Sequence, residues 1–273
     1  MQRRRKNDQF QEDCEHCGNV GVCDIGDCGG GGSDSTPVTQ PVVQPLPLPP
    51  PPSAEGVYGG KLTNSSSSDF QLLVLENGDF YSLYGTNTGS IFGVAGFIQG
   101  TGTSANNRFT SSNGKDFGTS PAAEVTTTAE YDPVGKTISG SVSSVRQTSN
   151  FSGGPIAGSL YNYNTPATLS TIIGSWSTTA ITGERVALTI AANGAFSATS
   201  GGGCRFSGAM TPRATGKNVF DVSLTFGAAP CALAGQSGSG IAVAYALTGG
   251  RTQLLVAASN ATRTNGTAVV GTR

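Results

Sequence analysis

The chain has 273 residues, with 16 basic and 17 acidic side chains, a formal net charge of −1 and only 12% charged residues. This balance provides no long-range positive field, and it argues against a protein that binds nucleic acid or an anionic membrane through bulk charge. The 40 glycines, with abundant Ser, Thr and Asn, predict an all-β, turn-rich exported protein rather than a helical cytosolic enzyme.

The first 28 residues concentrate the potential metal ligands of the chain. The C-x2-C pair within them is a good half-site for zinc, but the second pair of cysteines lacks that spacing. A knot of disulfides is another interpretation; it requires export, and these residues contain no apolar signal core. We expect no metal and no other cofactor. The weaker alternative is a metal site made of Cys14, His16, Cys17, Cys23 and Cys28.

The genetic code offers a third interpretation of residues 1–27. Read one base later from Asn7 onward, the same codons can encode a start, two basic residues and a run of small or apolar residues that ends beside Cys28. That layout is typical of a lipoprotein signal peptide. We therefore predict that residues 1–28 are a disordered or mistranslated segment that stands in place of a signal peptide.

A linker rich in glycine and proline follows at residues 29–55 and includes the run PLPLPPPP. Glycine gives flexible coil, and polyproline gives an extended spacer without donors for a sheet. A proline ligand for an SH3- or WW-type domain is one interpretation. A stalk that holds a folded domain off a surface explains the same composition more simply.

Short alternating apolar runs, broken by Gly, Asn, Ser and Thr, predict a first β-barrel-like domain over residues 56–165. Its clearest element is FQLLVLENGDFYSLYG, in which two strands flank Asn77 and Gly78. This dipeptide favours a type I′ hairpin turn. Glu76 and Asp79 flank the turn, and we expect both to be solvated.

A second copy of the pattern predicts a second domain over residues 170–273. Each copy opens with glycine, any residue and an aromatic, namely Gly56 and Tyr58 in the first and Gly174 and Trp176 in the second. Glycine lets a strand bend where a barrel closes, and the aromatic plugs that end of the core. A repeat of about a hundred residues suits an antiparallel barrel or sandwich of roughly eight strands.

Cys204 and Cys231 lie in this second domain, each beside a turn residue. No other potential metal ligand is close to them in sequence, so we predict that they form a disulfide. That bond would also indicate an oxidising compartment.

Catalytic chemistry has few candidates in the two domains. Neither domain contains a histidine, which excludes a Ser/His/Asp or Cys/His arrangement. Glu184 and Asp221 are the two acids of the second domain; they formally offer a glycosidase-type pair, although surface positions explain them. Arg185, Arg213 and Lys217 offer a weak site for an anion, and solvated loop positions explain them better. We expect no catalytic residues and no enzyme.

Three features together resemble those of a known group: CGGGGSDSTP, the proline-rich tether, and glycine-rich antiparallel domains that open with GVYGG and carry ENGDFYSLYG. In these features the chain, from Cys28 onward, resembles bacterial surface lipoproteins with small barrels of the transferrin-binding-protein-B and lipocalin-like group. The resemblance implies that Cys28 is the lipid-bearing first mature residue and, with Gly29 behind it, that the protein is sorted to the outer membrane. The sequence departs from a lipobox, because Asp27 and Ile25 stand where a small residue and leucine are usual.

These observations predict a non-catalytic lipoprotein of the cell envelope that presents its barrels to a ligand or to a host or partner protein. The alternative is a lipocalin-like carrier, which an apolar cavity inside a barrel would favour; the third is an extracellular hydrolase. The alternative location is secreted or periplasmic. Expected partners are the membrane, through acylated Cys28, and an unidentified protein or small molecule, with no nucleic acid and a monomeric state.

Overall fold

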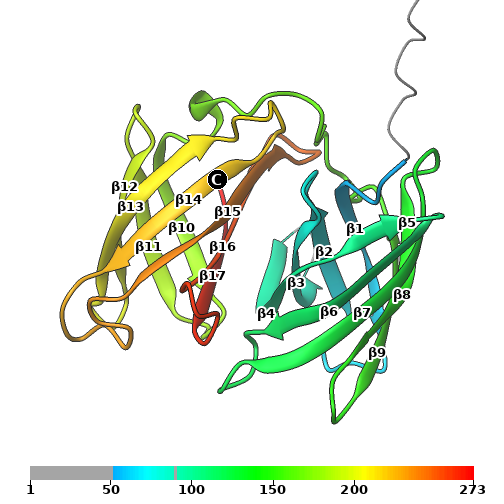
Figure 1. The fold of residues 1–273 in the computed structure, drawn as a ribbon. Coiled ribbons are helices and arrows are strands. Elements are labelled where there is room, and N and C mark those ends of the chain that lie inside the picture. The colour runs from blue at the N-terminus through cyan, green and yellow to red at the C-terminus, as the bar shows by residue number, and fades with distance from the viewer. Residues whose placement is uncertain (1–51, 89–90) are drawn as a thin grey trace, which may run out of the picture. The chain divides into compact units, whose positions relative to one another are not determined.

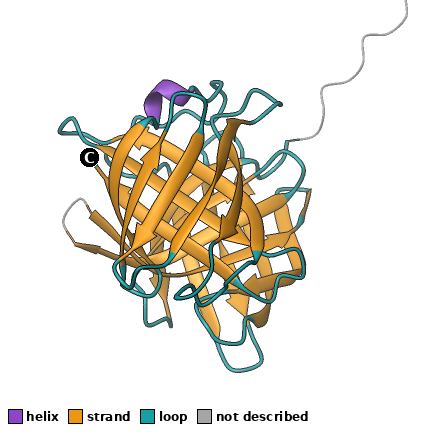
Figure 2. Cartoon of the chain, turned by 90° about the vertical axis from the view of Figure 1, so that its left-hand side faces the viewer, coloured by secondary structure: helices purple, strands orange, loops and turns teal. Residues whose placement is uncertain are grey.

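The computed structural model describes residues 52–88 and 91–273, which fall in one compact unit. The described chain consists of antiparallel strands joined by loops and one short helical turn (Figure 1; Figure 2). It forms two tandem barrels, which confirms the all-β fold class. Most of the linker at 29–55 lies outside the described residues. So do the hypotheses about a shifted reading frame, a metal site and a lipid anchor, which concern Cys14, His16, Cys17, Cys23 and Cys28.

Nine strands build the first barrel. They are β1 (Gly56–Thr63), β2 (Asp69–Val74), β3 (Asp79–Thr88), β4 (Ile91–Thr101), β5 (Thr103–Ala105), β6 (Arg108–Asp116), β7 (Ala123–Asp132), β8 (Thr137–Ser143) and β9 (Thr148–Gly154). Eight of them form a ring in the order β4-β3-β2-β1-β9-β8-β7-β6, while β5 pairs with β6 outside it. Two residue pairs between β4 and β6 close the ring, Ile98 with Asp116 and Gln99 with Lys115.

Buried and exposed residues alternate along strands of this barrel such as β7, and the buried ones face its interior. In β7 the inward residues Val125, Thr127, Ala129 and Tyr131 are buried between mostly exposed neighbours, as expected for a strand with one face on a core. The segment before β1 seals one end of the barrel, because Tyr131 donates its hydroxyl to the Pro52 carbonyl at 2.8 Å.

Eight strands close the second barrel in sequence order, with β10 paired to β17. They are β10 (Gly174–Ala180), β11 (Arg185–Ile190), β12 (Ala195–Ser200), β13 (Arg205–Pro212), β14 (Phe220–Phe226), β15 (Ser237–Ala246), β16 (Thr252–Ser259) and β17 (Gly266–Thr272), preceded by the helical turn η1 (Leu169–Thr171).

The two opening aromatics have the same surroundings in both barrels. Tyr58 is 1% exposed and donates its hydroxyl to the Ala54 carbonyl at 2.9 Å. Trp176 is 2% exposed and donates its indole N–H to the Ile172 carbonyl at 2.7 Å, again four residues earlier. The glycines that open the strands, Gly56 and Gly174, have φ angles of 145° and 107°, which other residues rarely adopt. Each aromatic thus ties the segment before its barrel to the end of the core.

The predicted type I′ turn is wrong in its detail. Of the two central residues only Gly78 has a positive φ, 86°, and its N–H donates to the Leu75 carbonyl at 3.0 Å. Leu75 in turn donates to the Asp79 carbonyl at 2.8 Å, so the loop holds three residues rather than two. A three-residue loop adopts a type I turn that ends in a left-handed glycine. Gly194, with a φ of 83°, repeats this geometry in the second barrel.

Candidate functional site

The first barrel is hollow, whereas the interior of the second is filled. A cavity of about 320 Å³ lies inside the first barrel, and a space inside the second measures about 20 Å³. Phe196, Met210 and Trp176 are among the buried side chains that fill the second barrel. Small-molecule sites usually begin at about 300 Å³. The first barrel therefore has room for a small ligand and the second does not.

The lining of this cavity has an apolar part and a polar part. The polar part includes residues from the β1–β2, β6–β7 and β8–β9 loops, which places the opening at the end of the barrel away from Tyr58. Inward apolar side chains of the strands form the body: Phe70, Leu72, Phe80, Ile98, Val125 and Phe151. Loop residues form the polar rim: Ser65, Ser66, Ser67, Thr119, Ser144 and Gln147. This division suits a ligand with an apolar body and a polar head.

Tyr84 and Asp116 form a hydrogen bond at the seam where the ring closes. The Tyr84 hydroxyl donates to Asp116 Oδ1 at 2.6 Å, and the Gly118 N–H donates to the same oxygen at 2.9 Å. Burial and the neighbouring carboxylate raise the pKa of Tyr84, which keeps the phenol protonated. A Cβ at Gly96 or Gly118 would lie 2.3 or 1.8 Å from the Tyr84 hydroxyl oxygen, so the bond depends on glycine at both positions.

Thr127 is an unsatisfied polar group in the wall of the cavity. Its side chain is directed inward from β7, it is 6% exposed, and its hydroxyl has no hydrogen-bond partner among the described residues. A buried polar group without a partner costs about 1–3 kcal/mol. Tyr84, Asp116 and Thr127 were not predicted from the sequence as site residues; the signal for them was a polar residue at an inward position of a strand.

A second apolar core lies outside both rings, between the outer faces of β2–β4 and of β15–β17. Gly266 permits the close approach, since a Cβ there would lie 2.7 Å from the rings of Phe97 and Phe117. Those two rings stack with centroids 4.6 Å apart. The buried members are Leu73, Leu75, Leu83, Phe92, Phe97, Phe117, Tyr163, Val219, Ile241, Val243, Tyr245, Leu247, Leu255, Ala257, Ala268 and Val270. The two barrels are thus packed through a core of their own.

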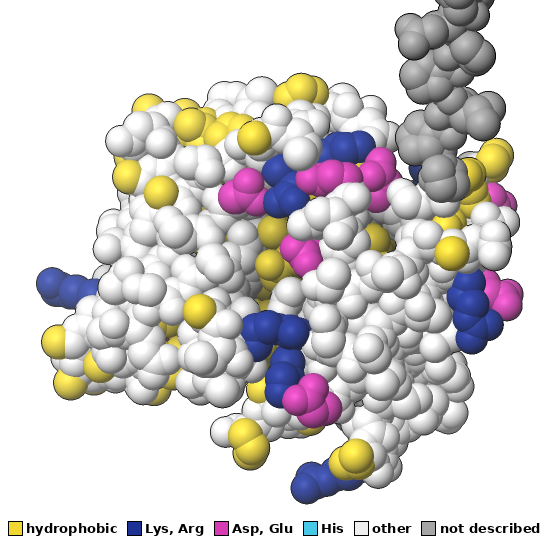
Figure 3. Space-filling view, viewed as in Figure 1, with side chains coloured by type: hydrophobic (Ala, Val, Ile, Leu, Met, Phe, Trp, Pro, Cys, Tyr) yellow, Lys and Arg dark blue, Asp and Glu magenta, His cyan; other side chains and the backbone are white. Residues whose placement is uncertain are grey.

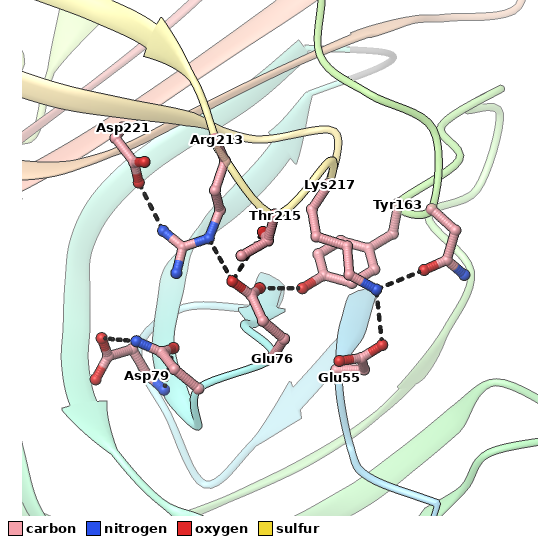
Figure 4. A network of polar contacts seen from close by, with 10 residues as sticks. Glu55, Glu76, Asp79, Tyr163, Arg213, Thr215, Lys217 and Asp221 are labelled. Atoms are coloured by element: carbon pink, nitrogen blue, oxygen red, sulfur yellow. Dashed lines mark hydrogen bonds and ion pairs between the residues drawn. The ribbon is translucent and has the colours of Figure 1, made fainter. Parts of the chain in front are cut away.

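A polar network borders this shared core (Figure 4). Arg213 donates from Nε to Glu76 Oε1 at 2.8 Å and from Nη1 to Asp221 Oδ1 at 2.6 Å. The hydroxyls of Thr215 and Tyr163 donate to the two Glu76 oxygens, each at 3.0 Å. Basic and acidic side chains accordingly gather beside one another on a largely uncharged face (Figure 3). Glu76, predicted to be a solvated turn residue, is instead a contact between the barrels and is 20% exposed.

The electrostatics of Glu76 follow from these donors. Burial by itself raises the pKa of this carboxyl, but hydrogen bonds from its own backbone N–H, Arg213, Thr215 and Tyr163 outweigh burial and lower the pKa to about 2. Glu76 is therefore ionised at neutral pH and balances the charge of Arg213, which is 14% exposed.

The structure corrects the interpretation of the basic loop residues. Arg213 and Lys217 are neither solvated nor available to an anion, because Lys217 donates to Glu55 Oε1 at 2.9 Å and Arg213 to Glu76 and Asp221. Lys217 also lies 4.9 Å from the centre of the Tyr163 ring. Arg185 is exposed at the start of β11, apart from this network.

The glycosidase-type pair does not form. Asp221 lies near the start of β14 opposite Thr211, at the end of the second barrel where β13 finishes. Glu184 lies at the other end, where it accepts a hydrogen bond from the Gly202 N–H. At that same end Cys204 and Cys231 are joined by a disulfide, with Cα atoms 4.5 Å apart. Asp79 accepts hydrogen bonds from its own turn and from Thr101.

The part of the chain that the structure describes contains neither a membrane-spanning helix nor a cluster of metal ligands. None of its helices is long and apolar enough to cross a membrane. Within residues 52–88 and 91–273, no three His, Cys, Asp or Glu side chains are grouped so that they could hold a metal ion.

Comparison with known proteins gives weak structural likeness only. Neither a family model nor a curated protein sequence matches the chain. Among solved structures, isotype 1 transferrin binding protein B from serogroup B Neisseria meningitidis is 11% identical with a TM-score of 0.27, over 75% of this chain and 65% of that one. A mutant of transferrin binding protein B from Haemophilus parasuis Hp5 is 10% identical with a TM-score of 0.25, over 78% and 65%. A DUF3598-family protein of unknown function from Nostoc punctiforme is 9% identical with a TM-score of 0.24, over 80% and 93%.

The matched region spans 65% of each of the two transferrin binding proteins B, the group that the sequence motifs resemble. At these scores the likeness defines neither fold nor function. The strands and contacts of this chain define a protein of two docked eight-stranded barrels, one of which is hollow.

Proposed function

We propose that this chain is a non-catalytic binding protein of the bacterial cell envelope that holds a small molecule inside its first barrel. The observation that carries the proposal is the contrast between the two interiors, about 320 Å³ against about 20 Å³. A barrel that serves only as structure gains from a filled core, because a void forfeits dispersion contacts. A cavity with an apolar body and a polar rim is better explained by a ligand.

The envelope part of the proposal rests on the sequence and on the disulfide. Disulfides persist in oxidising compartments, and Cys204 with Cys231 fits an exported protein. Cys28, followed by the glycine run and the proline-rich tether, is the proposed lipid anchor. The measurement is the intact mass of protein from the membrane fraction. Acylated Cys28 at the first mature position is expected, and a soluble chain with an unmodified Cys28 would contradict the anchor.

The ligand part can be tested with a neutral probe whose fluorescence rises in apolar surroundings, N-phenyl-1-naphthylamine. Ser82 lines the cavity from β3, so Ser82→Phe should fill it and abolish saturable binding of the probe. Ser139→Phe is the matched control, because Ser139 is exposed on the outer face of β8 in the same barrel. Far-ultraviolet circular dichroism checks that both variants fold. Equal probe binding by the two variants, or no saturable binding by the unmodified chain, would contradict the proposal.

A further inference from the structure

The described side chains that line the cavity carry negative charge only, and that charge comes from Asp116. Among the described residues that line the cavity it is the one with a charged side chain, and it forms no ion pair with any described residue. The neighbouring cation, Lys115, is paired with Glu124 on the next strand. Lys61 is 74% exposed and is paired with Asp69. The basic side chains nearest to Asp116 in sequence and on β1 are therefore held by other carboxylates.

The hydrogen bonds of Asp116 hold its carboxylate in place without neutralising it. Both donors, the Tyr84 hydroxyl and the Gly118 N–H, are uncharged, and both reach the same oxygen, Oδ1. Oδ2 has no hydrogen-bond donor among the described residues. A carboxylate in a partly desolvated site gains most from a cationic donor, because charge-assisted hydrogen bonds are about twice as strong as neutral ones.

The apolar wall of the cavity limits the length and the chemistry of the part of the ligand that lies beyond Asp116. From Asp116, which pairs with Ala123, the wall continues along β7 to Thr127, four residues further on. Four residues of strand span about 13 Å. The same cavity is lined by Phe70, Ile98 and Phe151, so the matching part of a ligand is a hydrocarbon.

From these observations we propose that the ligand of the first barrel is an amphipathic amine, with its ammonium group on Asp116 Oδ2 and its hydrocarbon along the apolar wall toward Thr127. This inference rests on the proposed function, since it names the ligand class for the same cavity. It excludes fatty acids and other apolar anions as the preferred class, because their carboxylate would face Asp116.

Three probes of equal chain length separate the contribution of the head-group charge to binding from that of the hydrocarbon. They are octylammonium, octan-1-ol and octanoate, and each is measured by isothermal titration calorimetry at pH 7 with the whole folded chain. The expected order of affinity is octylammonium, then octan-1-ol, then octanoate, with the ammonium about tenfold tighter than the alcohol. That ratio corresponds to about 1.4 kcal/mol, close to the lower end of the range for a hydrogen bond to a charged group.

Asp116→Asn is the discriminating variant, because its amide oxygen can still accept from Tyr84 and Gly118. It should bring octylammonium to the affinity of octan-1-ol and leave octan-1-ol unchanged. Glu130→Gln is the control, since Glu130 is an exposed carboxylate on the outer face of β7; it should leave all three probes unchanged.

The outcomes distinguish the inference from the proposed function. If octan-1-ol binds but octylammonium is no tighter, or if Asp116→Asn leaves octylammonium unchanged, the amine class is wrong while the cavity still binds. If none of the three probes binds, the proposed function itself fails.

Discussion

Removing the charge of Glu76 should weaken the contact between the barrels in a way that depends on pH. Glu76→Gln preserves the shape of the side chain but leaves Arg213, 14% exposed, with Asp221 as its remaining carboxylate partner. The pKa of Glu76 falls from 4.5 to about 2 on folding. A difference of about 2.5 corresponds to about 3 kcal/mol at about 1.36 kcal/mol per pKa unit, an upper value for the effect of the charge.

The sign follows from the direction of that shift. A carboxyl whose pKa is lowered on folding stabilises the folded state fully above its unfolded pKa, here 4.5, and loses this effect as the pH falls toward about 2. At pH 7 we therefore expect Glu76→Gln to lower the free energy of unfolding by about 1–3 kcal/mol. At pH 3 the difference between the variant and the unmodified chain should shrink by more than half.

Urea unfolding at the two pH values, followed by circular dichroism and by tryptophan fluorescence, measures this difference. The chain has one tryptophan, Trp176, buried in the second barrel, so its fluorescence reports that barrel alone. Asp79→Asn is the control, since Asp79 lies in the same turn and bonds to Asn77 and Thr101 but to no cation among the described residues. A destabilisation by Glu76→Gln that is equal at pH 7 and pH 3 would refute the reasoning.

Three other changes probe the disulfide, the shared core and the seam. Replacing both Cys204 and Cys231 by serine should lower the free energy of unfolding by about 3–4 kcal/mol, given their separation of 27 residues; an unchanged urea midpoint would count against this. Gly266→Val places a side chain where even a Cβ would lie 2.7 Å from two phenylalanine rings, so the barrels should unfold in two separate transitions; one coincident transition would contradict the packing. Gly96→Ala should displace Tyr84 from the seam and cost about 1–3 kcal/mol in thermal unfolding; an unchanged melting temperature would show that the seam adapts.

The alternation of apolar and polar residues along the sequence predicted the strands of both barrels. This alternation is lost in the strands that form the shared core. Strands β11 and β12 alternate strictly between exposed and buried residues, which is the pattern of a strand with one solvated face. In β16, Gln253 to Ala258 are all buried: Leu254 and Val256 face the barrel interior, while Leu255 and Ala257 face the other barrel. A continuous apolar run is the signal of burial on both faces. The stretches GIAVAYA and QLLVAAS are such runs, so burial on both faces of these strands is visible in the sequence.

The ion pairs between the two barrels could not be predicted from the sequence, because the partners lie far apart along the chain. Glu76 and Arg213 are 137 positions apart, and nothing local at either residue indicates the other. The repeat held one usable hint. At the place in the second turn that corresponds to Glu76 stands Ala192, two positions before Gly194 as Glu76 is before Gly78. A carboxylate in one copy and a methyl group in the other indicates that the role of Glu76 is specific to the first barrel.

The position of the shared core bears on how a hollow barrel stays stable. The first ring is closed between β4 and β6 by two residue pairs, at the place where Asp116 meets the cavity, and the cavity deprives its inner wall of contacts. The same β4 is held from outside, since Phe92 and Phe97 are 2% and 0% exposed in the shared core. The filled second barrel therefore supports the hollow one at its weakest seam. Gly266→Val lies outside the cavity, yet on this argument it should also weaken binding of N-phenyl-1-naphthylamine; unchanged binding would show that the first barrel keeps its shape unaided.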